Sequence, residues 1–249
     1  NTLFALNDTI FAGTDFGVYK TTNNGTLWTV ANDGFGSNRR VKNFDFNSGK
    51  IWCATEGSGL FFSTNFGTNW IREYGSYFSN TFAVAAKDQY VLTSSGTYVY
   101  YTTNLGANWI IMDQGPEPWG YSGIIIKDNF VYSADLDGIY LSFLGGTSWN
   151  YITGNLTGNS TEVNEIRYAN DKIYIATEGG VWSSSNNGSN WINLNPSLTS
   201  TSIWSLEISG PNIIIGTETQ IHISNNNGTT WSNVSAGLPA NPRVTEIAL

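Results

Sequence analysis

The stretch Ser184-Ser-Asn-Asn-Gly-Ser-Asn-Trp191 decides the organisation of this chain, because close copies of it recur along the whole sequence. The copies begin at Thr21, Ser63, Thr102, Ser142, Ser184 and Ser224, with separations of 42, 39, 40, 42 and 40 residues. Every copy ends in tryptophan. Self-similarity at a fixed period of roughly 20–50 residues indicates a repeat architecture built from one small structural unit.

The repeated phrase predicts a tight turn. Asn at its third position can bond backbone groups nearby, and Gly at its fifth position tolerates positive φ. The closing Trp offers a large apolar face to a neighbouring repeat. Leu144 replaces Asn in the fourth copy, so we expect that turn to lack the side-chain bond. The residues predicted to be structural are Asn23, Gly25, Trp28, Asn65, Gly67, Trp70, Asn104, Gly106, Trp109, Gly146, Trp149, Asn186, Gly188, Trp191, Asn226, Gly228 and Trp231.

Four short apolar runs accompany each copy of the phrase. In the fifth repeat they are 164–169, 172–177, 180–183 and 191–194. Four short strands in a period of about 40 residues are typical of a β-propeller blade. We therefore predict one all-β domain over 1–249, made of four-stranded antiparallel blades. The expected blades span approximately 1–38, 39–80, 81–120, 121–161, 162–201 and 202–243.

The phrase resembles the Asp-box (BNR-repeat) motif, S/T-x-D/N-x-G-x-T/S-W, of sialidases, sortilin-like receptors and photosystem II assembly factors. The resemblance covers nearly the whole chain. It implies a propeller whose ligands bind at the central opening of the face that carries the loops after the second and fourth strands. The Asp boxes would then lie toward the opposite, outer rim and have a structural role.

The blade count leaves two alternatives. Six boxes are accompanied by a seventh run of inner-strand type at 244–249. Either six blades close the ring and this strand is surplus or replaces the first, or the chain belongs to a longer array with a seventh blade. The count of boxes favours six blades.

Composition excludes several functions. The net charge is −8 with only 11 Lys and Arg residues, and no basic cluster of the kind that binds nucleic acid is present. No apolar run approaches the roughly 18 residues of a membrane helix. One Cys, in the apolar run around Cys53, and one His, His222, cannot supply a disulfide framework or a conventional zinc site. We expect no metal, no cofactor and no identifiable catalytic residue.

An acidic residue recurs after the second strand of five repeats. The five acids are Asp15, Glu56, Asp135, Glu178 and Glu218. They could form a ring at the opening that attracts a cation or a sugar. The alternative is a turn residue copied with the repeat, because repeated positions mostly report the shared fold.

Paired carboxylates also permit glycoside hydrolysis. The resemblance to sialidases implies three arginines around the substrate carboxylate and a Tyr nucleophile supported by Glu. Among the five arginines, Arg39, Arg40, Arg72, Arg167 and Arg243, both Arg40 and Arg243 precede an inner strand, where they could reach the opening. The Phe/Tyr-Arg-Ile-Pro segment of sialidases is absent, so a complete arginine triad is not expected.

One loop departs from the repeat. The segment Asp113-Gln-Gly-Pro-Glu-Pro-Trp-Gly-Tyr121 places Glu117, Trp119 and Tyr121 on a loop stiffened by two prolines. Tyr74 belongs to the expected neighbouring loop. Rigid loops that present aromatic side chains commonly bind ligands. Trp119 could equally fill the junction between two blades.

These observations favour a non-catalytic recognition or scaffold module, extracellular or at the cell surface, that binds a glycan or an extracellular protein. The alternative is a glycoside hydrolase of sialidase-like ancestry. Assembly factors with Asp boxes typically display a basic arginine patch, which this acidic chain does not show. Neither nucleic-acid binding nor membrane insertion is expected.

Overall fold

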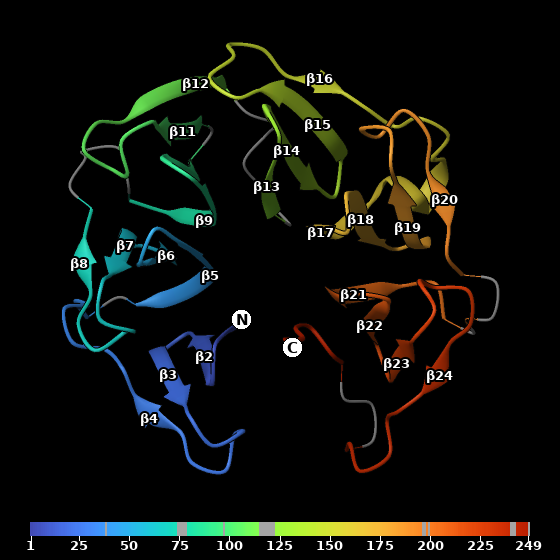
Figure 1. The fold of residues 1–249 in the computed structure, drawn as a ribbon, viewed down its shortest axis with the longest axis horizontal. Coiled ribbons are helices and arrows are strands. Elements are labelled where there is room, and N and C mark those ends of the chain that lie inside the picture. The colour runs from blue at the N-terminus through green and yellow to red at the C-terminus, as the bar shows by residue number, and fades with distance from the viewer. Residues whose placement is uncertain are drawn as a thin grey trace.

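The protein is an all-β, six-bladed propeller with four-stranded antiparallel blades (Figure 1). The computed structural model describes residues 1–37, 39–73, 79–96, 98–114, 123–195, 198, 200–239 and 243–248. Within these residues the non-strand regular structure is a short 3-10 helix, η1 (Gly158–Thr161). The predicted fold class is confirmed.

The blades follow one another in chain order, and within each the strands are paired in sequence. Blade 1 contains β1 (Thr2–Leu6), β2 (Thr9–Thr14), β3 (Gly17–Thr21) and β4 (Thr29–Val30). Blade 2 contains β5 (Arg40–Asn47), β6 (Lys50–Glu56), β7 (Gly59–Ser63) and β8 (Ile71–Arg72). Blade 3 contains β9 (Thr81–Lys87), β10 (Tyr90–Ser95), β11 (Tyr98–Thr102) and β12 (Ile110–Gln114). Blade 4 contains β13 (Gly123–Lys127), β14 (Phe130–Asp135), β15 (Gly138–Phe143) and β16 (Asn150–Tyr151). Blade 5 contains β17 (Val163–Ala169), β18 (Lys172–Thr177), β19 (Gly180–Ser184) and β20 (Ile192–Asn193). Blade 6 contains β21 (Ile203–Ser209), β22 (Asn212–Thr217), β23 (Ile221–Ser224) and β24 (Ser232–Asn233).

The first hairpin of every blade closes through a two-residue turn. In blade 1, for example, Leu6 pairs with Thr9. The first turn residue has positive φ in each case, which suits the twist of a tight hairpin. These residues are Asn7, Ser48, Asp88, Asp128, Asn170 and Gly210.

The repeated phrase forms the turn between the third and fourth strands. In five copies, the Asn side-chain oxygen accepts the backbone N–H of the seventh residue at 2.9 Å. The first-position hydroxyl accepts the N–H of the glycine, as Ser184 does from Gly188 at 2.9 Å. These bonds satisfy backbone donors that the short fourth strand leaves unpaired.

The fourth copy is shifted by one residue. Strand β15 continues to Phe143, and Leu144 donates its N–H to the carbonyl of Asn129, as Leu105 in the third copy does to Gln89. Positive φ falls on Gly145, so the prediction that Gly146 supplies it is wrong by one position. Leu144 packs into the apolar core instead of bonding the turn.

The core lies between blades rather than within them. Five apolar clusters each join neighbouring sheets, and the tryptophan that closes the phrase contributes to them. The Trp70 Nε1–H of blade 2 donates to the carbonyl of Ala31 in blade 1 at 2.9 Å. Trp231 makes the matching bond to Leu194 at 2.7 Å.

The inner strands β1, β5, β9, β13, β17 and β21 surround a central axis, and both chain ends lie near it (Figure 1). Residues 243–248 lie between blade 6 and blade 1 and form no strand. The inner-type strand predicted at 244–249 is therefore not paired into a sheet within the described residues.

Candidate functional site: the central channel and its rim

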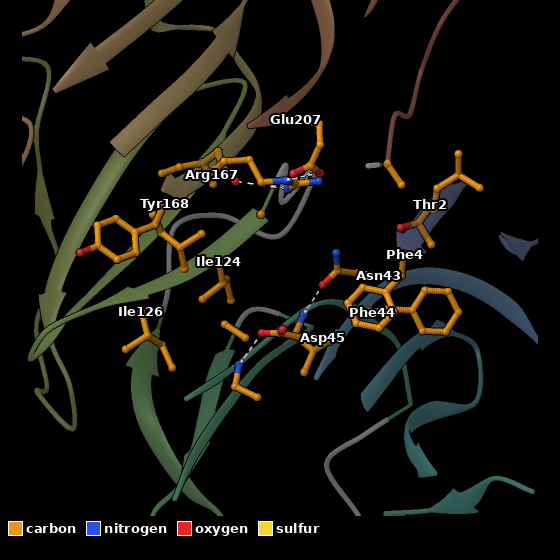
Figure 2. Close-up of a pocket in the computed structure, with 18 of the residues that line it drawn as sticks. Thr2, Phe4, Asn43, Phe44, Asp45, Ile124, Ile126, Arg167, Tyr168 and Glu207 are labelled. Carbon is orange, nitrogen blue, oxygen red and sulfur yellow. Dashed lines mark hydrogen bonds and ion pairs between the residues drawn. The ribbon is translucent and has the colours of Figure 1, made fainter. Parts of the chain in front are cut away.

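Side chains from the inner strands line a cavity of about 450 Å³ at the propeller axis (Figure 2). A smaller cavity of about 190 Å³ lies toward the starts of the same strands. The two share Thr2, Asn43, Gly123 and Arg167, so they form two parts of one channel. The inner strands begin on the face that carries the loops after the second and fourth strands, which we call the upper face.

Arg167 occupies the junction of the two cavities. Its guanidinium forms an ion pair with Glu165, and its Nη2 lies 3.5 Å from Oε1 of Glu246. Its Nε lies 3.9 Å from Oε2 of Glu207, beside which Figure 2 shows the guanidinium. One cation thus faces three carboxylates drawn from β17, β21 and the segment 243–248.

This arrangement changes the acidity of the carboxyl groups. Burial raises the pKa of Glu165 to about 8 against the opposing charge of Arg167. Burial also raises the pKa of Glu246 to about 7. Both carboxyl groups therefore take up a proton at higher pH than exposed glutamates do, which limits the repulsion among the acids of the cluster.

Asp45 lines the larger cavity on the opposite side of the channel (Figure 2). Its carboxylate accepts the backbone N–H groups of Ala86 and Phe46, each at 2.7 Å. Burial nevertheless raises the pKa of Asp45 to about 6. Phe4, Ile124 and Tyr168 supply the apolar part of the wall.

Two of the predicted rim acids are paired with cations. Arg40 bridges them, with Nε 3.6 Å from Asp15 and Nη1 3.1 Å from Glu56. Lys42 lies 3.0 Å from the other oxygen of Glu56. A hydrogen bond from Asn1 lowers the pKa of Asp15, and one from Lys42 lowers that of Glu56.

The remaining three predicted acids differ from one another. Glu178 accepts a hydrogen bond from Asn164 at 2.9 Å, which repeats the contact between Asp15 and Asn1. Asp135 is buried and caps its own turn by accepting the N–H groups of Asp137 and Gly138. Glu218 contributes a backbone carbonyl that accepts the N–H of Arg243. For Asp135 these contacts indicate a structural role in its own turn.

Arg243 covers the ring of Trp204, with its guanidinium carbon 3.8 Å from the ring centroid. Trp204 lines the smaller cavity together with Lys42 and Asn164. Trp204 is half-buried at the upper end of the channel. Trp119, Tyr121, Glu117 and Tyr74 lie outside the described residues.

The central cluster of Asp45, Glu165, Arg167, Glu207 and Glu246 is not predicted from the sequence. A signal was present, because the inner strands β5, β17 and β21 each carry a charged residue between two apolar residues. In the described part of the chain, no group of three or more His, Cys, Asp or Glu side chains is arranged to hold a metal ion.

Comparison with known proteins identifies the fold. No protein-family model matches the sequence, and no curated protein matches it. Among solved structures, the extracellular domain of the putative hybrid two component system BT4673 from B. thetaiotaomicron superimposes with a TM-score of 0.76 at 15% identity, covering 99% of this chain and 35% of that chain.

YCF48 bound to D1 peptide superimposes with a TM-score of 0.69 at 16% identity, covering 94% of this chain and 81% of that chain. An ancestral GH74 enzyme gives a TM-score of 0.71 at 19% identity, covering 93% of this chain and 37% of that chain. The chain thus spans only about a third of the length of the GH74 and BT4673 chains. Identities this low establish the propeller fold and not a shared function.

Across the described residues, no helix has the length and apolar character needed to cross a bilayer.

Proposed function

We propose that this propeller is a non-catalytic recognition module that binds a glycan or a protein segment at the upper end of its channel. The observation that carries the proposal is the cluster around Trp204. An aromatic ring held under Arg243, with Lys42 and Asn164 beside it, combines an apolar face with hydrogen-bond donors. Ligand sites commonly pair apolar or aromatic surface with a few placed polar groups.

The pKa values and the contacts of the carboxyl groups near the channel support binding over catalysis. A glycosidase needs one carboxylic acid with a raised pKa that reaches the scissile bond, opposite a second carboxylate. The pKa values of Asp15 and Glu56 are lowered by their partners. Glu165 has a raised pKa, but it is only 5% exposed, and its two oxygens contact Arg167 and the N–H of Leu206. The pKa of Asp45 in the larger cavity is also raised, but its two oxygens accept the N–H groups of Phe46 and Ala86.

The fold neighbours are consistent with recognition of a polymer. They include an extracellular domain and a propeller solved with a peptide. By analogy with these neighbours, we place the module outside the cell or at its surface. We also propose that the repeated turn is an Asp box. The GH74 neighbour supports the alternative of a glycoside hydrolase, which the same experiment tests.

The test is retention of the protein on glycan and peptide arrays, with released sugars measured in parallel. For a ligand so found, Trp204→Leu and Lys42→Ala should each raise the dissociation constant about tenfold, the effect of losing about 1.4 kcal/mol. Trp119→Ala examines the proline-stiffened loop in the same titration. Arg72→Ala, on the outer strand β8, is the charge-matched control and should bind like the parent.

Ligand binding that none of the Trp204, Lys42 and Trp119 variants weakens would place the site elsewhere. Sugar release abolished by replacing one rim acid would establish the hydrolase instead.

A further inference from the structure

Each inner strand places one side chain at the same level of the channel. In every blade this residue is the cross-strand partner of the third residue of the second strand, as Asp45 is of Trp52 and Arg167 is of Tyr174. All six of these residues line the larger cavity, and we call them the channel ring. In blade order, the channel ring consists of Phe4, Asp45, Ala85, Ile125, Arg167 and Glu207.

The charges of the channel ring are unevenly distributed. Arg167 stands next to Glu207, and it also pairs with Glu165 and Glu246, so three carboxyl groups already share its charge. Asp45 is separated from Arg167 by the two apolar positions of blades 3 and 4, and Figure 2 shows the two residues on different sides of the cavity. In the part of the chain that the structure describes, no ion pair involves Asp45.

The Asp45 carboxylate is held in place and keeps acceptor capacity. Oδ1 accepts the N–H of Phe46 and Oδ2 accepts that of Ala86, each at 2.7 Å. A carboxylate oxygen can accept two hydrogen bonds, so each oxygen retains one acceptor position. Burial raises the pKa of Asp45 to about 6 in spite of these two donors and the charge of Arg167. A cation in the cavity would therefore stabilise the ionised carboxylate, because buried charges are tolerated when they are paired.

The walls beside Asp45 are apolar. Phe4 and Ala85 are its neighbours in the channel ring, and Ile125 follows Ala85. The second cation of the lining, Lys87, lies at the end of β9, two residues past Ala85. The inner strands of blades 2, 3 and 4 pack directly on one another, so the wall of Asp45, Ala85 and Ile125 is built without the first or last residues of the chain.

We propose that the larger cavity binds a small organic monocation, in which a primary ammonium group is carried on an apolar body. The ammonium group donates to Asp45, and the body packs against Ala85 and Ile125. The cavity of about 450 Å³ is of the size of small-molecule sites, which also pair apolar walls with a few polar groups. A metal ion fits less well, since no group of three or more His, Cys, Asp or Glu side chains able to hold one occurs among the described residues. The site does not involve Trp204, so it is independent of the ligand proposed for the upper end of the channel.

The test compares three molecules with a similar aromatic body and different end groups. They are 2-phenylethylammonium, 2-phenylethanol and phenylacetate, and isothermal titration calorimetry near neutral pH measures the binding of each to the whole protein. The ammonium ion should bind about tenfold more tightly than the alcohol, as expected for one charge-assisted hydrogen bond. Phenylacetate should give no detectable binding, because its carboxylate would face that of Asp45.

Two variants locate the bound cation. Asp45→Asn removes the charge with little change of shape, so the ammonium ion should bind it no more tightly than the alcohol does. Ala85→Leu fills part of the cavity, so both molecules should bind about tenfold more weakly, a loss of about 1.4 kcal/mol. Asp88→Asn is the charge-matched control, because Asp88 is exposed in the turn after β9 and does not line the cavity, and it should bind like the parent.

Circular dichroism of each variant separates loss of binding from loss of folding, and the comparison of the three molecules needs no variant. The proposal is overturned if the parent binds the ammonium ion no more tightly than the alcohol. It is also overturned if folded Asp45→Asn keeps the preference for the ammonium ion, or if folded Ala85→Leu binds that ion like the parent.

Discussion

At the scale of single residues, the most unusual feature is the cluster of one arginine and three glutamates at the axis. Arg167 is a half-buried cation whose partners come from different segments of the chain. A buried ion pair adds little to the free energy of unfolding, but removing one partner destabilises the protein because the other charge is left unpaired. The cluster ties β17, β21 and residues 243–248 together at the centre of the ring.

We predict that the free energy of unfolding falls as pH rises from about 5 to 8. Glu165 and Glu246 have folded-state pKa values of about 8 and 7, above their ordinary value of 4.5. The folded state therefore holds protons that the unfolded chain releases, so this contribution is complete below pH 4.5 and is lost as pH rises through 7 to 8. Urea denaturation across this pH range measures it.

In Glu165→Gln the same pH dependence should be flatter. Glu56→Gln is the control of opposite sign, because Lys42 and Arg40 lower the pKa of Glu56. The contribution of Glu56 to the free energy of unfolding is present above its ordinary pKa and is lost as pH falls. An unchanged slope in Glu165→Gln would show that Glu165 does not carry the bound proton.

At the scale of elements, the repeated turn holds the outer part of each blade. The fourth strands of five blades have only two residues. So short a strand makes too few backbone hydrogen bonds to hold it against the third strand. The turn before them compensates with side-chain bonds to the backbone. Blade 4, with its shifted turn and Leu144 in the core, reaches the same geometry by apolar packing.

Asn186→Ala should destabilise the protein by about 1–2 kcal/mol, because two donors lose their acceptor. These donors are the hydroxyl of Ser184 and the N–H of Asn190, each 2.9 Å from Oδ1. Ser185→Ala, at the exposed neighbouring position, should stay within about 0.5 kcal/mol of the parent. Chemical denaturation compares the two, and equal effects would remove the structural role of the Asn.

At the scale of the whole molecule, stability comes from packing sheet on sheet around the ring. In blades 2 to 5 the second strand is covered on both faces, whereas β2 and β22 are each covered on one. Repeat proteins gain stability from each neighbour interface, so blades with one neighbour are the weakest.

Native-state hydrogen exchange should therefore be slowest in β6, β10, β14 and β18, and faster by at least tenfold in β2 and β22. Local opening costs less free energy where fewer apolar contacts are broken. Mass spectrometry of the exchanging protein resolves these strands. Uniform protection around the ring would mean that blades 1 and 6 are stabilised by contacts other than apolar cover.

The sequence by itself determined the repeat, the four strands of each blade and the propeller, because the turn phrase and the strand pattern are local and recur six times. It also indicated the rim position of Arg40 and a seventh inner-type run. Only the tertiary structure decided which side chains meet at the axis. Asp45, Arg167 and Glu207 lie in three different blades, and the ring must form before they share one channel. The one-residue shift of the fourth turn and the capping role of Asp135 depend in the same way on backbone geometry that the residue pattern does not encode.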